Sequence, residues 1–183
     1  MRRAWIITLS VLAALVVASL LIGAASFGDD AGWLLMVSRL PRTAAALLAG
    51  AGLALAGVVV QQVVRNRLVE PSLTGAPEAS MLGLLGVTLI APGLAVAGKM
   101  LIAAAAALAG MAGYLALATR LPREDPMLLP IVGMVYGGIL GAVGVYIAWT
   151  ADLMQFLGAW RLGEFSGVMQ GRYEWLWAIA ALA

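Results

Sequence analysis

The chain has 183 residues, of which 63% are hydrophobic and only 11% are charged, with a formal net charge of +2. A soluble domain carries about twice that share of charged residues, so the composition excludes an ordinary soluble protein. The small net charge gives no support for nucleic-acid binding. The chain has no Cys and no His, which excludes disulfides, thiolate metal sites and the commonest general base. We therefore expect an all-α polytopic membrane protein with no catalytic residues and no metal site.

The first apolar run covers residues 4–25 and follows Arg2 and Arg3. A cleaved signal peptide also starts in this way, but the run is longer than the apolar region of most signals, which favours a retained helix. The positive-inside rule then places the N-terminus in the cytoplasm. Residues 31–38 are apolar but short, so we expect Pro41 to break this segment and the segment to lie along the outer interface.

Five further apolar runs predict membrane crossings, because about 20 apolar residues of helix span a bilayer core. The last of them is too short to span, since at 1.5 Å per residue it covers only about 17 Å. A helix that stops inside a bilayer leaves its carbonyls unsatisfied, so we expect the chain to be a fragment of a longer protein. An outer loop with a short helix is expected over residues 150–172. The five runs are residues 43–64, 79–90, 99–119, 127–149 and 173–183.

Arg39 and Arg42 flank Pro41 at the start of the second crossing. With a cytoplasmic N-terminus, both lie on the outer side of the membrane. They either reach lipid phosphates or form a docking surface for the carboxylates of an extracytoplasmic partner. The residues alone favour the lipid interpretation, because interfacial arginines are common.

A polar turn follows the second crossing on the cytoplasmic side. Charges at this place are typical of the inner end of a membrane helix. Its glutamate could pair with a neighbouring arginine or with a cytoplasmic subunit. The turn contains Arg65, Asn66, Arg67, Glu70 and Pro71.

Glu78 lies at the start of the short third crossing. A carboxylate there is favoured by the positive N-terminal end of the helix dipole, so we expect it to stabilise the helix start. The alternative is that Glu78 lines a water-filled path, because a carboxylate that faces lipid is costly.

Gly133, Gly137 and Gly141 are spaced by four residues, and Gly144 follows closely. This spacing places the first three on one face of a helix. Such a face permits close helix packing, or it forms a smooth wall along a translocation path with a gate. Both interpretations stay open at the level of sequence.

Residues 39–80 resemble the permease subunits of FecCD/BtuC-type ATP-binding cassette (ABC) importers, which take up iron-siderophores, haem and vitamin B12. The resemblance is carried by RLPRTAAALLAGAGLALAGVVVQQVVRN, by the EPS and LTG that follow, and by residues 160–174. Residues 66–71 read NRLVEP where the family tends to have NPLAEP, and residues 75–79 read GAPEA where it tends to have GASSG. Both departures resemble the branch that imports ferric catecholate siderophores.

The resemblance implies a BtuC-like multi-helix permease of about ten transmembrane helices, of which this chain would supply about five to six. It implies a second permease subunit, identical or different, in the cytoplasmic (inner) membrane. It also implies separate ATPase subunits that hold ATP and Mg, so this chain would bind no cofactor and would not be an enzyme. A substrate-binding protein would dock through Arg39 and Arg42, and the helix at residues 127–149 would line the path and gate.

Two other classes of protein remain as alternatives. A proton-coupled secondary transporter would need a carboxylate inside the membrane, and Glu78 is the nearest acidic residue to one. A non-transporting membrane scaffold would pack through its glycine faces.

Overall fold

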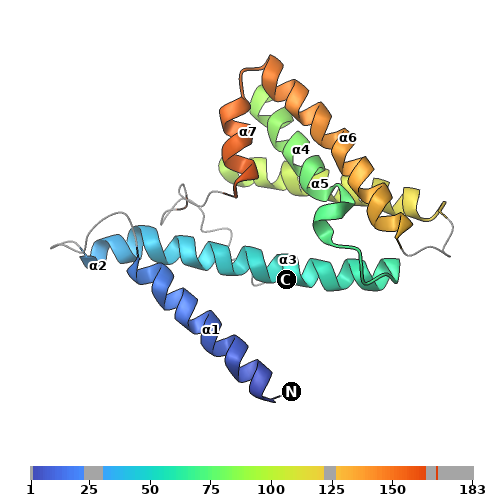
Figure 1. The fold of residues 1–183 in the computed structure, drawn as a ribbon. Helices are drawn as coiled ribbons and strands as arrows, with labels where there is room; N and C mark the ends of the chain where they lie inside the picture. Colours follow the sequence, from blue (N-terminus) through green and yellow to red (C-terminus); the bar gives the residue numbers. More distant parts are fainter. Residues whose placement is uncertain (1, 23–30, 122–126, 164–167, 169–183) are drawn as a thin grey trace. The chain divides into compact units, whose positions relative to one another are not determined.

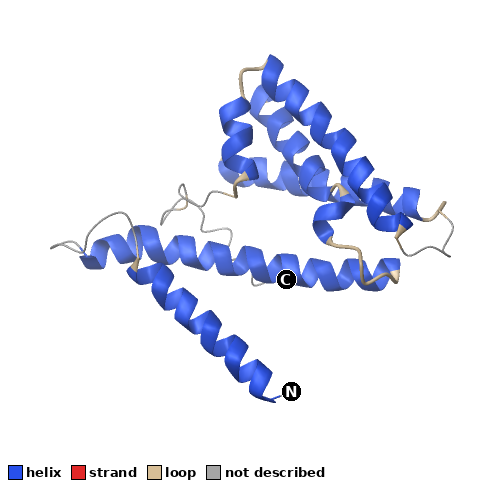
Figure 2. Ribbon diagram, viewed as in Figure 1, coloured by secondary structure: helices blue, strands red, loops and turns tan. Residues whose placement is uncertain are grey.

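The computed structural model describes residues 2–22, 31–121, 127–163 and 168 (Figure 1). These residues form helices and turns, with no strand among them (Figure 2). Four helices in the described part are long and apolar enough to cross a membrane. The predicted all-α membrane fold is confirmed. The expected crossing at residues 173–183 lies outside the described residues.

The chain divides into two compact units, which are described separately: Met1–Ala51 with Phe165–Ala183, and Gly52–Glu164. The first unit holds α1 (Arg2–Leu21) and the first part of α3 (Leu40–Val64). A hydrogen bond of 2.9 Å between the Ser19 and Thr43 hydroxyls joins these two helices. Such bonds between hydroxyls are a common way to join helices in lipid.

The prediction that Pro41 breaks the segment before it is wrong. The helix α2 (Ala31–Leu34), the π-helical turn η1 (Leu35–Arg39) and α3 follow one another, and residues Gly32–Val64 form one candidate span. Proline normally disrupts a helix because its ring clashes with the preceding turn and it has no N–H to donate. Here the Leu40 N–H donates to the Leu35 carbonyl, so a wider turn lies directly before Pro41 and accommodates the ring.

The second unit is organised around α4 (Ala76–Ile90), which packs against α5 (Val96–Ala118) and α6 (Leu128–Thr150) (Figure 1). Small residues bring α4 and α5 together. A Cβ placed on Gly110 would overlap that of Ala79, and one placed on Gly83 would overlap that of Ala106. Close approach through small residues is the usual basis of helix association in lipid.

The helix α4 begins at Ala76, before the residue 79 expected from the sequence. The 3-10 turn η2 (Pro71–Thr74) precedes it, and Gly75 between them has φ 72°, a conformation that favours glycine. Pro77 fits the first turn of the helix, where no N–H is needed. The expected short helix after α6 is present as α7 (Met154–Arg161).

Two clusters of buried side chains hold the second unit together. Val60, Val69 and Tyr114 form one of them, and the Tyr114 hydroxyl donates to the Leu129 carbonyl at 3.2 Å. The other joins α4, α6 and α7, and it positions the pocket described below. Its members are Met81, Leu85, Ala148 and Leu157.

Candidate functional site

The glycine face of α6 is buried at all four predicted positions, Gly133, Gly137, Gly141 and Gly144. A Cβ on Gly133 would overlap the Leu73 carbonyl, and one on Gly144 would overlap the Met81 side chain. The two ends of the face are therefore close packing contacts with η2 and α4. This arrangement matches the packing interpretation for these two glycines.

The middle of the same face borders a cavity of about 380 Å³. Pockets that hold small molecules commonly measure about 300–1,000 Å³, so this one is near the lower end of that range. Gly137 and Gly141 line this cavity with backbone atoms only. Because they have no side chains, space remains beside α6. Residues from η2, α4 and α7 complete the lining, among them Leu73, Glu78 and Arg161.

Glu78 projects into this cavity from the first turn of α4. Its Oε2 would lie 3.4 Å from a Cβ on Gly137, and its Cγ 3.5 Å from one on Gly141. At 1.5 Å per residue, Gly141 is about 20 Å from the start of α6 and about 14 Å from its end. Glu78 therefore starts a helix, as expected, but it lies at the depth of the middle of a membrane span.

The Glu78 carboxylate has no bond that would explain its position as a helix cap. At the start of α4 the Ala76 N–H donates to the Thr74 Oγ1 at 3.4 Å, and Glu78 takes no part in that bond. The Oε2 atom is inaccessible to solvent and has no hydrogen-bond partner among the described residues. An inaccessible carboxylate oxygen without a partner is costly, so this group is the chemically unusual feature of the pocket.

Arg161 is the second charged residue of the pocket, and sequence reasoning did not select it as a site residue. It lies in the last turn of α7, and its Nη2 would lie 3.7 Å from a Cβ on Gly141. Within the described part of the chain it forms no ion pair with Glu78. The sequence did offer one indication of this role: Arg161 ends a short helix that directly follows an apolar span.

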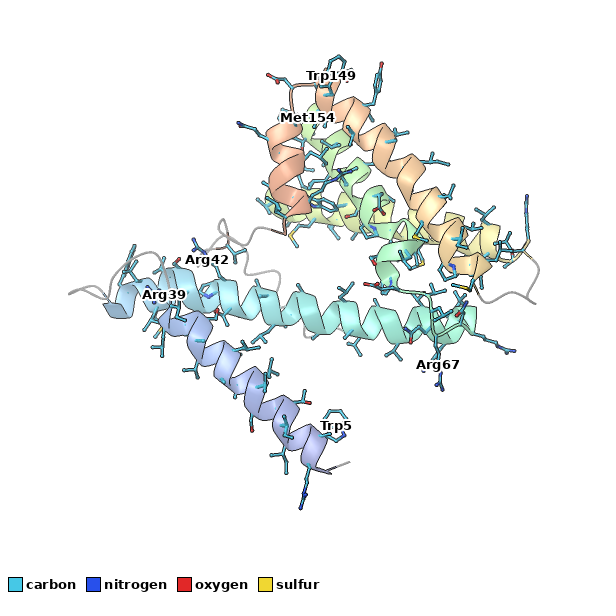
Figure 3. The ribbon with its side chains drawn as sticks, viewed as in Figure 1. Trp5, Arg39, Arg42, Arg67, Trp149 and Met154 are labelled. Atoms are coloured by element: carbon cyan, nitrogen blue, oxygen red, sulfur yellow. The ribbon has the colours of Figure 1, made fainter. Side chains whose placement is uncertain are left out.

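Arg39 and Arg42 come from the same end of the long helix (Figure 3). Arg39 is only 9% exposed, and its Nη1 donates to the Leu20 and Leu21 carbonyls at 3.0 Å each. These carbonyls belong to the last turn of α1, where a positive charge and a donor are both favourable. Arg39 therefore caps α1, a role that the sequence did not indicate.

The predicted cytoplasmic turn is tightly structured at its start. The Arg65 N–H donates to the Gln62 carbonyl and the Asn66 N–H to the Gln61 carbonyl, which closes α3 with a Schellman motif. The side chain of Asn66 is buried, and its Oδ1 accepts from the Leu68 N–H at 2.9 Å. Asn66 is thus a structural residue of the turn.

The charged residues of this turn point into solvent instead of pairing with one another. Arg65, Arg67 and Glu70 are exposed, and the described residues give Glu70 no ion pair with either arginine. Pro71 is buried, with its ring 3.6 Å from a Cβ placed on Gly57. The charges are therefore available to a partner, while Pro71 fixes the turn to α3.

These features define a polytopic helical membrane protein with a charged pocket beside one span. Residues 3–183 match the FecCD transport family, and the chain belongs to that family.

Its relatives include two permease proteins with siderophore substrates in their names. It is 34% identical to the ferric-anguibactin transport system permease protein FatD of Vibrio anguillarum, over 82% of this chain and 48% of the relative. It is also 34% identical to the petrobactin import system permease protein FatD of Bacillus anthracis, over 82% of this chain and 45% of the relative. The chain thus spans about half the length of the curated relatives that it matches.

A solved structure has the same fold. It is described as an inward-facing conformation of a metal-chelate type ABC transporter, with a TM-score of 0.72 and 23% sequence identity. The match covers 100% of this chain and 60% of that one.

Proposed function

We propose that the complete protein is the transmembrane permease subunit of an ABC importer that moves ferric siderophores across the inner membrane. The observation that carries this proposal is the family match over residues 3–183. Relatives named for ferric-anguibactin and petrobactin favour an iron-siderophore substrate. The finer assignment to a ferric catecholate rests on the departures NRLVEP and GAPEA in the sequence.

The proposed machine has four kinds of component. This permease pairs with a second permease, and the path between the two is closed or opened by movements of their helices. Separate ATPase subunits bind ATP and Mg and perform the hydrolysis, so the permease itself makes and breaks no bonds. The N-terminus is cytoplasmic. A substrate-binding protein delivers the siderophore on the opposite, outer side of the membrane.

Docking of the binding protein is assigned to the end of the long helix that carries Arg39 and Arg42. Because Arg39 is buried and caps α1, we expect it to act mainly by positioning that end. The test is the affinity of the binding protein for the complete permease with Arg39→Glu and Arg42→Glu, measured at low and high salt. Salt weakens ion pairs at the rim of a docking interface, and Arg42 is the half-exposed member of the two arginines, so unchanged affinity under both conditions would exclude this docking surface.

The transport function is tested by reconstitution of the complete permease with its ATPase and binding protein in vesicles. We expect uptake of radiolabelled iron, as its catecholate complex, that requires ATP and continues after the proton gradient is collapsed. Uptake that stops with the gradient while ATP is preserved would favour the proton-coupled transporter. A complete, assembled protein without uptake of any ferric siderophore would favour the membrane scaffold.

A further inference from the structure

Side chains of opposite charge from α4 and α7 meet at Gly141, and the Glu78 carboxylate itself lies one turn away, with its Oε2 3.4 Å from a Cβ on Gly137. A Cβ on Gly141 would lie 3.5 Å from the Glu78 Cγ and 3.7 Å from the Arg161 Nη2. Because Gly141 has no side chain, nothing on α6 separates the two groups there. The structure therefore brings Glu78 and Arg161 close together but leaves them without a bond.

The depth of this point makes an unpaired state costly for Glu78, whose Oε2 is inaccessible to solvent, while Arg161 is exposed. Gly141 is near the middle of α6, about 14 Å from the nearer end of that span. Charged side chains at such depth face a cavity or pair with one another, because hydrocarbon does not solvate them. An Arg–carboxylate pair would satisfy both groups through charge-assisted hydrogen bonds.

The helix that carries Arg161 is a short unit with a change of backbone direction at each end. It has eight residues, and left-handed residues lie on either side of it, Asp152 at φ 57° and Gly163 at φ 62°. Its main anchor is Leu157, which is buried against Met81, Leu85 and Ala148. A rotation about this anchor would carry Arg161 across the open space of the pocket.

We propose that Glu78 and Arg161 form an intramembrane ion pair in another state of the transport cycle and thereby position α7 over Gly141. In this structure the two side chains form no ion pair, and both border the cavity of about 380 Å³. Pairing would narrow the cavity between them and fix α7 against α4. This inference rests on the proposed transport function, since it assigns the pair to a step of that cycle.

The test uses charge exchange in the complete permease, assembled with its ATPase and binding protein. Glu78→Arg and Arg161→Glu are each expected to lower siderophore uptake about tenfold, and the exchanged double variant is expected to recover most of it. Arg120→Glu is the matched control for reversal of a single charge, because Arg120 is exposed just after α5, and it is expected to transport normally. Uptake by both single variants at the wild-type level would overturn the proposal.

A second measurement reads the pair without relying on transport. The thermal unfolding of Glu78→Gln, Arg161→Gln and the double variant is compared in the nucleotide-free complex and in the complex arrested with ATP and vanadate. We expect the two substitutions to be non-additive in one state and additive in the other, because the pair exists in only one of them. Additive effects in both states, or the same coupling in both, would overturn the proposal even if the exchanged variants fail to assemble. A wild-type complex without uptake would instead contradict the proposed function.

Discussion

Arg39 provides the sharpest test of how this part of the membrane fold is held together. Replacing it with Met keeps much of the length of the side chain but removes the hydrogen bonds to the Leu20 and Leu21 carbonyls. Bonds from a charged donor contribute about 1.5–3 kcal/mol each in soluble proteins, whereas bonds between membrane helices average about 0.6 kcal/mol. For two bonds at the end of a helix we expect a loss of about 2 kcal/mol.

The Arg39→Lys variant separates charge from geometry. An ammonium keeps the favourable charge at the end of α1 but lacks the guanidinium plane, so we expect it to retain about half of the stabilisation. The measurement is reversible unfolding of the complete permease in mixed micelles, together with amide exchange in the last turn of α1. Arg67→Met is the matched control, because Arg67 is exposed on the polar turn. If Arg39→Met and Arg67→Met unfold at the same denaturant fraction, the cap contributes nothing and the reasoning is refuted.

Three other substitutions test local features by thermal unfolding. Arg65 has φ 55°, so Arg65→Gly should stabilise the permease by up to about 1 kcal/mol, and Arg65→Val should destabilise it; a loss with glycine would contradict the helix-end assignment. Gly133→Ala should destabilise it strongly, because the new methyl overlaps the Leu73 carbonyl, while Gly138→Ala should be neutral, with nothing within 4 Å of it; equal effects would show that the glycine face is not closely packed. Tyr136→Phe removes a hydrogen bond of 3.1 Å to the Gly110 carbonyl and should cost about 1 kcal/mol, and no change would mean that this bond is not formed in the membrane.

The apolar runs predicted the class of fold because hydrocarbon requires long apolar helices. The motif from Arg39 to Pro71 also predicted the protein family, and the family match confirms that prediction. The path through Pro41 could not be predicted, since proline usually ends a helix and a π turn has no sequence signature. A pattern of residues indicates where a span lies more reliably than how its ends are built.

The site was harder to predict than the fold, because the depth of a side chain along a membrane span depends on how the helices pack. Glu78 was correctly placed at the start of a helix, but its depth follows from how η2 and α4 lie against α6. The contact between the Leu73 carbonyl and Gly133 fixes that arrangement, and it joins residues far apart in the chain. Arg161 was missed for the same reason, since only the return of α7 toward Gly141 brings it near a carboxylate.

The π turn η1 also sets the angular register of the long helix. One residue of α-helix corresponds to a rotation of about 100°, so the extra residue held in a π turn offsets the faces on its two sides by that angle. Deleting one residue within Leu35–Arg39 would let this turn close as ordinary α-helix and would leave the two flanking faces aligned as they are. Converting η1 to α-helix without a deletion would instead turn the preceding segment by about 100° relative to Thr43. The π turn therefore lets the helix hold one more residue between the same two faces.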